Sequence, residues 1–252
     1  MSYSKKLGQN FIVNPFYLER LVLLSDVKSD DIILEIGAGN GELTKKLCEK
    51  ANTVISYEID KKLFKNSQRM LAKYNNLILI NGDALKTNYT FNKVVSNLPY
   101  YISKRFIYWL VTKSFTSATV TLQKDFVEKL IAQPSSKSYK AISVIAQLAF
   151  KINVYDIIPP TAFYPVPKVF SYIVKFEPKN QYILNKSLIK NINLIFTFRG
   201  KKIRTVIKRL SKNNFFYNNL ESEFKNLNLN LNERIENLTP HECFSIAKIL
   251  LK

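Results

Sequence analysis

The sequence contains few of the residues that usually carry metal, redox or acid–base chemistry. It has one histidine, His241, and two cysteines, Cys48 and Cys243, which lie far apart. A single histidine argues against zinc chemistry and against a histidine-based catalytic triad. The two cysteines form neither a disulfide framework nor a metal-binding spacing. We therefore expect no bound metal, and we expect His241 to lie in the first turn of a helix after Pro240.

Long apolar runs are also missing. No stretch of about 18 uncharged apolar residues occurs, so no transmembrane helix is expected. The basic start of the chain, residues 1–6, is not followed by an apolar signal core. We expect a protein without a membrane partner that works in a cytoplasmic compartment, with an organelle as the open alternative.

Acidic residues are scarce relative to basic ones. Lys and Arg total 38 and Asp and Glu total 19, which gives a net charge of +19 at pH 7 and a pI near 9.8. A lysine-rich genomic bias would explain the preference for Lys over Arg, but it does not explain the shortage of acids. The excess of positive charge indicates a polyanionic partner, most simply nucleic acid.

Strand-like and helix-like patterns alternate through the first 180 residues. The expected strands cover residues 31–36, 53–58, 77–80, 93–95, 118–122, 154–158 and 171–176. The expected helices cover residues 15–24, 42–50, 61–74, 104–113, 124–132 and 141–150. This alternation predicts an α/β fold with a mostly parallel sheet covered on both faces. After about residue 187 only short helices are expected, so we place a boundary near 180, between domains 1–180 and 181–252.

Residues 95–103 combine features suited to holding a planar nitrogenous base. Pro99 ends the preceding strand because it has no N–H to donate, which puts Asn97 at a strand's carboxyl end, where open α/β sheets bind ligands. The Asn97 side-chain oxygen and the Leu98 carbonyl can accept hydrogen bonds from an exocyclic amine, and Tyr100 offers a face for stacking. An ordinary strand-ending turn explains this short motif equally well by itself, so its surroundings decide.

One part of those surroundings is a glycine loop after the first expected strand. Its glycines follow the spacing G-x-G-x-G, with Gly37 and Gly39 as the first two. Glycine allows a tight strand-to-helix turn and a close approach of a ligand to the backbone. Dinucleotide folds more typically show G-x-G-x-x-G, whereas this spacing is commoner in methyltransferases that bind S-adenosylmethionine (SAM).

Acidic residues end the next two expected strands. Glu58 can accept hydrogen bonds from both ribose hydroxyls of a nucleoside. Asp83 is placed to accept from an adenine amine, and the Ala84 N–H is available to a ring nitrogen. A single acid of this kind is more often a helix N-cap, the role we expect for Asp60. Acids at two successive strand tips, beside a glycine loop, predict SAM as the cofactor.

These motifs resemble the rRNA adenine N6,N6-dimethyltransferases. That superfamily includes the KsgA-type enzymes of small-subunit rRNA and the Erm-type resistance enzymes of large-subunit rRNA. The resemblance covers nearly the whole chain and rests on residues 7–11 (Leu-Gly-Gln-Asn-Phe), 35–41, 58, 82–84 and 97–100. Segments 122–147, 159–169 and 199–204 look like the KsgA type, and the last of these is unlike what we expect in Erm types.

The resemblance implies a Rossmann-like, SAM-dependent methyltransferase domain with a mostly parallel seven-stranded sheet, followed by a small all-helical RNA-binding domain. It implies cofactor contacts from residues of the arm, the glycine loop and the strand tips: Gln9, Asn10, Ile12, Gly37, Glu58, Asp83 and Asn97. The glycine loop and the strand tip themselves add Gly39 and Ala84 to these cofactor contacts. It implies contacts to the target adenine from Asn97, Leu98, Tyr100 and Phe163, with Pro99 stiffening the turn between them.

Three positions depart from the family's pattern. Tyr101 stands where Asn is usual, Lys104 and Arg105 replace a small residue and a proline, and Lys140 replaces a glycine. The first two departures border the target pocket. None of the three falls on a residue assigned to the chemistry, so the expected activity stands.

Basic residues are the candidates for contacts to RNA phosphates. The set is Lys104, Arg105, Lys137, Lys140, Arg199, Lys201, Lys202, Arg204, Lys208 and Arg209. A solvated surface position explains most of them individually. Residues 199–212 differ because they contain no acid and carry apolar residues between the basic ones. That pattern predicts a helix with one face on the domain and the other on RNA.

We therefore expect a SAM-dependent enzyme that dimethylates the N6 amines of two adjacent adenines in the 3′-terminal hairpin of small-subunit rRNA. Its substrate would be an immature small subunit, and the enzyme, expected to be a monomer, would also serve ribosome biogenesis. Two alternatives stay open: an Erm-type methyltransferase of a large-subunit adenine, and a non-catalytic nucleic-acid-binding relative. The segment 199–204 speaks against the first, and the complete set Glu58, Asp83 and 97–100 speaks against the second.

Overall fold

The computed structural model describes residues 10–179, 182, 184–210 and 229–250. The chain forms two compact units. The first contains the residues up to 127 together with 151–178, and the second contains 128–150 together with the residues from 179 onward. The sequence-based division at 180 lies next to one crossing between the units, but it assigned 128–150 to the first domain. The division into functional domains stays a prediction.

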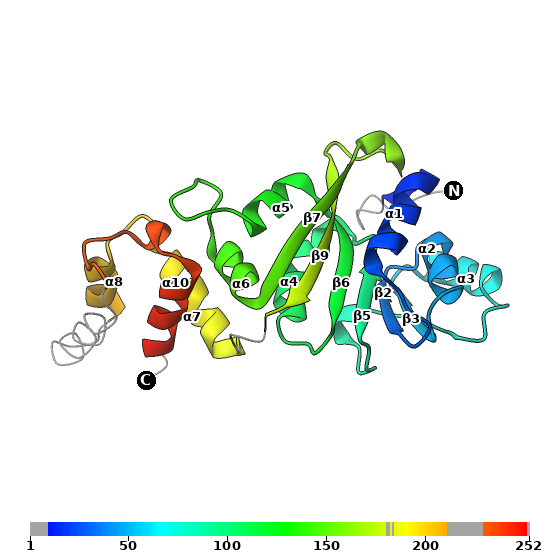
Figure 1. Ribbon diagram of the computed structural model, residues 1–252, viewed down its shortest axis with the longest axis horizontal. Coiled ribbons are helices and arrows are strands. Elements are labelled where there is room, and N and C mark those ends of the chain that lie inside the picture. Colours follow the sequence, from blue (N-terminus) through cyan, green and yellow to red (C-terminus); the bar gives the residue numbers. More distant parts are fainter. Residues whose placement is uncertain (1–9, 180–181, 183, 211–228, 251–252) are drawn as a thin grey trace. The chain divides into compact units, whose positions relative to one another are not determined.

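A seven-stranded sheet forms the centre of the first unit (Figure 1). Its strands, in spatial order, are β4 (Leu77–Asn81), β3 (Thr53–Glu58), β2 (Ile32–Ile36), β5 (Lys93–Ser96), β6 (Ser117–Gln123), β9 (Ser171–Pro178) and β7 (Phe150–Ile158). The first five pair in parallel, and β9 runs antiparallel to β6. Continuous apolar runs such as 32–36 form central strands because both faces are buried. The predicted mostly parallel α/β sheet is confirmed.

The helices of the first unit connect these strands. They are α1 (Pro15–Ser25), α2 (Glu42–Cys48), α3 (Lys61–Met70) and α4 (Ser103–Leu110), while α5 (Lys124–Leu130) follows β6. Figure 1 shows α1 in front of the sheet and α4 behind it. The Asp60 carboxylate accepts from two backbone N–H groups in the first turn of α3, which confirms its predicted capping role.

A two-stranded sheet joins distant parts of the first unit. Strand β1 (Phe11–Ile12) pairs antiparallel with β8 (Phe163–Tyr164), which follows the short helix η4 (Pro160–Ala162). The Ala162 carbonyl also accepts a hydrogen bond from the Val13 N–H at 2.9 Å. The arm before α1 therefore lies beside the segment that carries Phe163.

The second unit is helical. It contains α6 (Ala141–Ala149), α7 (Lys186–Phe196), α8 (Ile203–Leu210), the short helix η5 (Ile235–Asn237) and α10 (Pro240–Ile249). Helix α6 packs against α7 and α10, and the fully buried Tyr139 donates its hydroxyl to the Leu238 carbonyl at 2.8 Å. These contacts are why the segment 128–150 groups with the C-terminal helices. His241 lies in the first turn of α10, as predicted.

Candidate active site

The site begins where β2 ends in the glycine loop. Gly37 and Gly39 have φ angles of +89° and +57°, a region that favours glycine. A Cβ on Gly39 would lie 2.7 Å from Cε1 of Phe11, so a side chain does not fit there. The Gly37 N–H donates to the Tyr57 carbonyl at 2.8 Å, which ties the loop to the tip of β3.

Glu58 lies at that tip and is 5% exposed. Its Oε2 accepts from the Gly39 N–H and its Oε1 from the Asp60 N–H, both at 2.9 Å. Burial raises the pKa of this carboxyl, and the two backbone donors oppose that shift. Each oxygen keeps a lone pair, so the carboxylate can accept from two neighbouring hydroxyls.

Asp83 follows β4, the strand next to β3. Its Oδ1 caps the short helix η2 (Ala84–Lys86) by accepting from the Leu85 N–H at 3.0 Å. Its Oδ2 forms an ion pair with Arg105 on α4 at 3.1 Å. Asp83 therefore has two roles. It caps a short helix, as single acids often do, and it also lines the pocket.

Asn97 follows β5, and both ends of its amide are held. Its Nδ2 donates to the Asn10 carbonyl at 2.7 Å, and its Oδ1 accepts from the Thr121 hydroxyl on β6 at 2.6 Å. A backbone carbonyl only accepts, so Nδ2 must face Asn10 and Oδ1 must face Thr121. This network fixes the orientation of the amide.

The residues after Asn97 continue the wall of the site. Leu98 is 1% exposed. Pro99 lies against the glycine loop, since its Cγ is 3.6 Å from the position of a Cβ on Gly37. Tyr100 starts the short helix η3 (Tyr100–Ile102), and its hydroxyl shares a 2.7 Å hydrogen bond with Ser171 on β9. Burial raises the pKa of Tyr100, so its phenol stays protonated at neutral pH.

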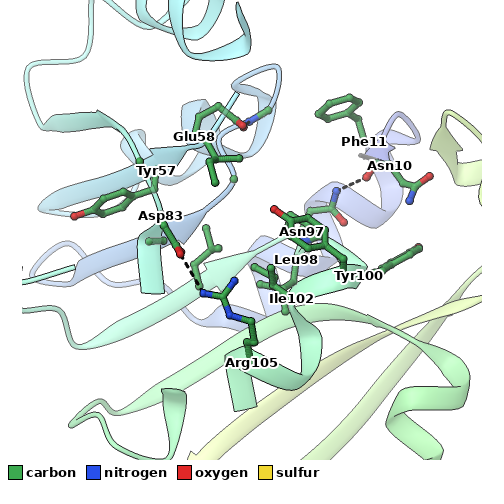
Figure 2. Close-up of a pocket in the computed structure, with 18 residues that line it drawn as sticks. Asn10, Phe11, Tyr57, Glu58, Asp83, Asn97, Leu98, Tyr100, Ile102 and Arg105 are labelled. Carbon is green, nitrogen blue, oxygen red and sulfur yellow. Dashed lines mark hydrogen bonds and ion pairs between the residues drawn. The ribbon is translucent and has the colours of Figure 1, made fainter. Parts of the chain in front are cut away.

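These groups line one pocket at the carboxyl ends of the parallel strands. Figure 2 shows Glu58 and Asp83 on one side of it and Asn97 and Tyr100 on the other. The other lining residues are Asn10, Phe11, Ile36, Gly37, Gly39, Tyr57, Ile59, Gly82, Ala84, Leu98, Pro99, Tyr101, Ile102 and Arg105. No histidine or cysteine lines this pocket among the residues that the structure describes.

Comparison with known proteins identifies the family. The model of the family described as ribosomal RNA adenine dimethylase matches residues 2–252. The chain belongs to this family. It is 33% identical over 255 residues to a ribosomal RNA small subunit methyltransferase A of Clostridium botulinum, covering 95% of this chain and 91% of the relative. It is 32% identical to a probable ribosomal RNA small subunit methyltransferase A of Methanococcus vannielii, covering 99% and 97% of the two chains.

Solved structures agree with this placement. The crystal structure of a dimethyladenosine transferase from Plasmodium falciparum has a TM-score of 0.78 at 28% identity, covering 94% of this chain and 95% of that one. The crystal structure of the 23S rRNA methyltransferase ErmE has a TM-score of 0.69 at 23% identity, covering 96% and 100%, and shows the shared fold. The predicted Rossmann-like methyltransferase fold is confirmed.

As a member of the rRNA adenine dimethylase family, the chain is an rRNA adenine dimethyltransferase with SAM as its cofactor. The pocket fits this nucleoside cofactor. The buried Glu58 carboxylate has the paired acceptors that a ribose diol needs, and Asp83 offers a carboxylate at the end of the neighbouring strand. The positive φ angles of Gly37 and Gly39 let a ligand approach the loop backbone.

The structure brings most of the predicted site residues together, with three exceptions. Gln9 lies outside the described residues. Ile12 is 8% exposed and belongs to the hydrophobic core; it lines a neighbouring hollow with Asn97 rather than the pocket itself. Phe163 is 1% exposed, packs in the same core and does not line the pocket. Its contact with a target adenine stays a prediction.

Sequence reasoning missed two hydroxyls that hold the site, those of Thr121 and Ser171. Both side chains are fully buried, on β6 and β9. The parallel register pairs Ser96 with Val120, which places Thr121 beside Asn97. The alternation of residues along β6 was visible in the sequence, but the register that brings Thr121 to Asn97 was not.

The basic residues predicted to contact RNA fall into different environments. Arg105 is paired with Asp83 in the pocket, and Arg199 is only 27% exposed, paired with Glu236 at 3.0 Å. Helix α8 buries three apolar side chains, Ile203 among them, in the second unit. The exposed members of the predicted set are Lys104, Arg105, Lys137, Lys201, Lys202, Arg204, Lys208 and Arg209, with Lys140 half-buried.

Membrane-spanning helices and metal-binding clusters are both missing from the described residues. None of their helices is long and apolar enough to cross a membrane. No cluster of three or more His, Cys, Asp or Glu side chains among them is arranged to hold a metal ion.

Proposed function

We propose that this enzyme dimethylates the N6 amines of two adjacent adenines in the 3′-terminal hairpin of small-subunit rRNA. Its substrate is an immature small ribosomal subunit, on which it acts as a monomer in the cytoplasm and also serves subunit biogenesis. Relatives named ribosomal RNA small subunit methyltransferase A match over nearly their whole length, which supports the small subunit over a large-subunit target.

The observation that carries the proposal is the fixed amide of Asn97 in the nucleoside pocket. Its Oδ1 has two lone pairs, of which Thr121 takes one. The other is free to accept an N–H of a target adenine, and the Leu98 carbonyl is proposed to accept the second N–H. Tyr100 and Phe163 are proposed to stack on the flipped base.

The adenine amine is a weak nucleophile because its lone pair is delocalised into the ring, and these acceptors are proposed to make it more reactive. Two hydrogen bonds from the amine favour a more sp3-like nitrogen and stabilise the positive charge that develops during transfer. SAM supplies the methyl group on a positively charged sulfur. The proton leaves to water after transfer, so no side chain has to act as general base.

The test is Asn97→Ala, assayed with small subunits whose rRNA lacks the methyl groups. We expect methyl transfer to be abolished and the affinity for the subunit to change by less than about twofold, because the phosphate contacts are elsewhere. An equal loss of RNA affinity and methyl transfer would contradict the role assigned to Asn97. Normal transfer by this variant would also contradict it.

A further inference from the structure

The Thr121–Asn97 hydrogen bond is distinctive within its own strand. Strand β6 carries two fully buried threonines on the same face, Thr119 and Thr121. The Thr121 hydroxyl donates to Asn97 Oδ1 at 2.6 Å, whereas the Thr119 hydroxyl has no hydrogen-bond partner. A buried hydroxyl is costly unless it is paired, and of these two threonines only Thr121 is paired, through the amide that lines the pocket.

The next strand repeats the arrangement. On β9, the fully buried Ser171 shares a hydrogen bond with the Tyr100 hydroxyl at 2.7 Å. Strands β6 and β9 are antiparallel neighbours, with Gln123 opposite Ser171. Two buried hydroxyls from adjacent strands therefore hold the side chains of Asn97 and Tyr100, which line the pocket.

Dimethylation makes a special demand on the acceptors. In each transfer the nitrogen lone pair forms the new N–C bond, the C–S bond breaks with its electron pair kept by sulfur, and one N–H proton leaves to water. The amine therefore starts with two N–H donors, has one during the second transfer and has none in the product. A buried acceptor that loses its only donor is destabilised.

We propose that Thr121 is the positioning residue that equips Asn97 for the second methyl transfer. Its hydroxyl fixes the direction of Oδ1 and stays as a donor to it when the amine has fewer N–H groups to offer. This inference rests on the proposed role of Asn97 and adds a residue that no motif of the sequence marks. Without the Thr121 hydroxyl, the second transfer loses more than the first.

The experiment compares Thr121→Val with Thr119→Val, which removes an unpartnered hydroxyl from the same face of the same strand. Single-turnover transfer to unmethylated small subunits is followed, and N6-methyladenosine and N6,N6-dimethyladenosine are quantified separately. For Thr121→Val we expect the second transfer to slow by about tenfold, as expected for one lost hydrogen bond, so that the monomethylated base accumulates. Thr119→Val should keep the normal rate and product ratio.

Three further variants make the outcome decisive. Thr121→Ser keeps the hydroxyl and should restore the product ratio, and Thr121→Ala removes it in a second way if the valine variant folds poorly. A product ratio for Thr121→Val and Thr121→Ala equal to that of Thr119→Val would overturn the inference. Asn97→Ala separates the two claims: an active Asn97→Ala enzyme refutes the proposed role of Asn97, whereas an inactive one with normal Thr121 variants refutes only the role of Thr121.

Discussion

Two neighbouring strands, β2 and β3, carry buried carboxyl groups, those of Glu35 and Glu58. Glu58 receives backbone N–H donors on both oxygens. Glu35 receives the hydroxyls of Thr44 and Ser56, both on Oε2 at 2.6 Å, and its Oε1 is buried without a hydrogen-bond partner. Glu58 lines the pocket, whereas Glu35 accepts hydrogen bonds from α2 and β3 inside the fold.

The environment of Glu35 leads to a prediction for the pH dependence of stability. Burial raises the pKa of Glu35 to about 7, and the two hydroxyls only partly offset this. Between about pH 4.5 and 7 the folded state then binds more protons than the unfolded state, so the free energy of unfolding falls as pH rises. The contribution is on the order of 3 kcal/mol, from 1.36 kcal/mol per unit of pKa.

Glu35→Gln should remove most of this slope, as measured by urea unfolding at several pH values between 4.5 and 8. Glu58, whose pKa is also raised by burial, gives the remaining decline in the same direction. Identical slopes for the two proteins would show that Glu35 ionises normally in the folded state.

Single residues differ in how far the sequence predicted them. Asp60 and Glu58 were placed correctly because a cap and a strand tip follow from local pattern alone. Asp83 was predicted from its place after a strand, but its pairing with Arg105 depends on α4 lying beside β4's end. Arg105 was predicted to contact a phosphate, which stays a prediction, and its ion pair with Asp83 could not be read from the sequence.

At the scale of single elements, the first turn of α4 carries two neighbouring basic residues that have different contacts. Both side chains are exposed. Arg105 lines the pocket and pairs with Asp83, whereas the Nζ of Lys104 lies 5.8 Å from the Tyr108 ring centroid. We expect Arg105→Ala to weaken SAM binding about two- to fivefold, because the exposed ion pair that holds the Asp83 carboxylate is worth at most about 1 kcal/mol.

Lys104→Ala is the matched control and should leave SAM affinity unchanged. Isothermal titration calorimetry gives the SAM affinities, and RNA binding at several salt concentrations gives the phosphate contacts. If Arg105→Ala instead left SAM affinity intact and reduced the salt slope by about one, Arg105 would be a phosphate contact after all.

The basic cluster that the sequence predicted to face RNA lies in helix α8 and in the residues just before it. Lys201, Lys202 and Arg204 are exposed, while Ile203 beside them is fully buried. The triple change of these three basic residues to alanine should weaken RNA binding and lower its salt slope by about one per lost phosphate contact. Replacing three other exposed lysines of the same unit, Lys186, Lys190 and Lys248, gives an equal charge change. Equal salt slopes of RNA binding for the two triple variants would show that Lys201, Lys202 and Arg204 are ordinary surface residues.

The extent of the elements was predictable, and their pairing was not. Strands such as 53–58 and helices such as 61–70 match the periodicity of apolar residues to within a few positions. The short pairing of β1 with β8 joins residues about 150 positions apart and has no local signal. Phe163 lies in β8, so its burial could not be read from the sequence around it, and its contact with a target adenine, which the resemblance implied, stays a prediction.

At the scale of the whole molecule, the two compact units of the structure differ from the two domains that the sequence predicted. Residues 128–150 continue the strand–helix alternation, so sequence places them with the sheet. Their side chains contact C-terminal helices instead, as Tyr139 does at Leu238. Packing partners of an apolar helix such as α6 cannot be read from its own periodicity, because the same apolar face fits any complementary surface.

The most direct test of the account is methyl transfer from labelled SAM to two substrates, with the modified bases mapped. One is small subunits that lack the methyl groups, and the other is protein-free large-subunit rRNA. We expect N6,N6-dimethyladenosine at two adjacent adenines of the small-subunit 3′-terminal hairpin and no transfer to the large-subunit rRNA. A single modified adenine in the large-subunit rRNA, with an unmodified small subunit, would contradict the account.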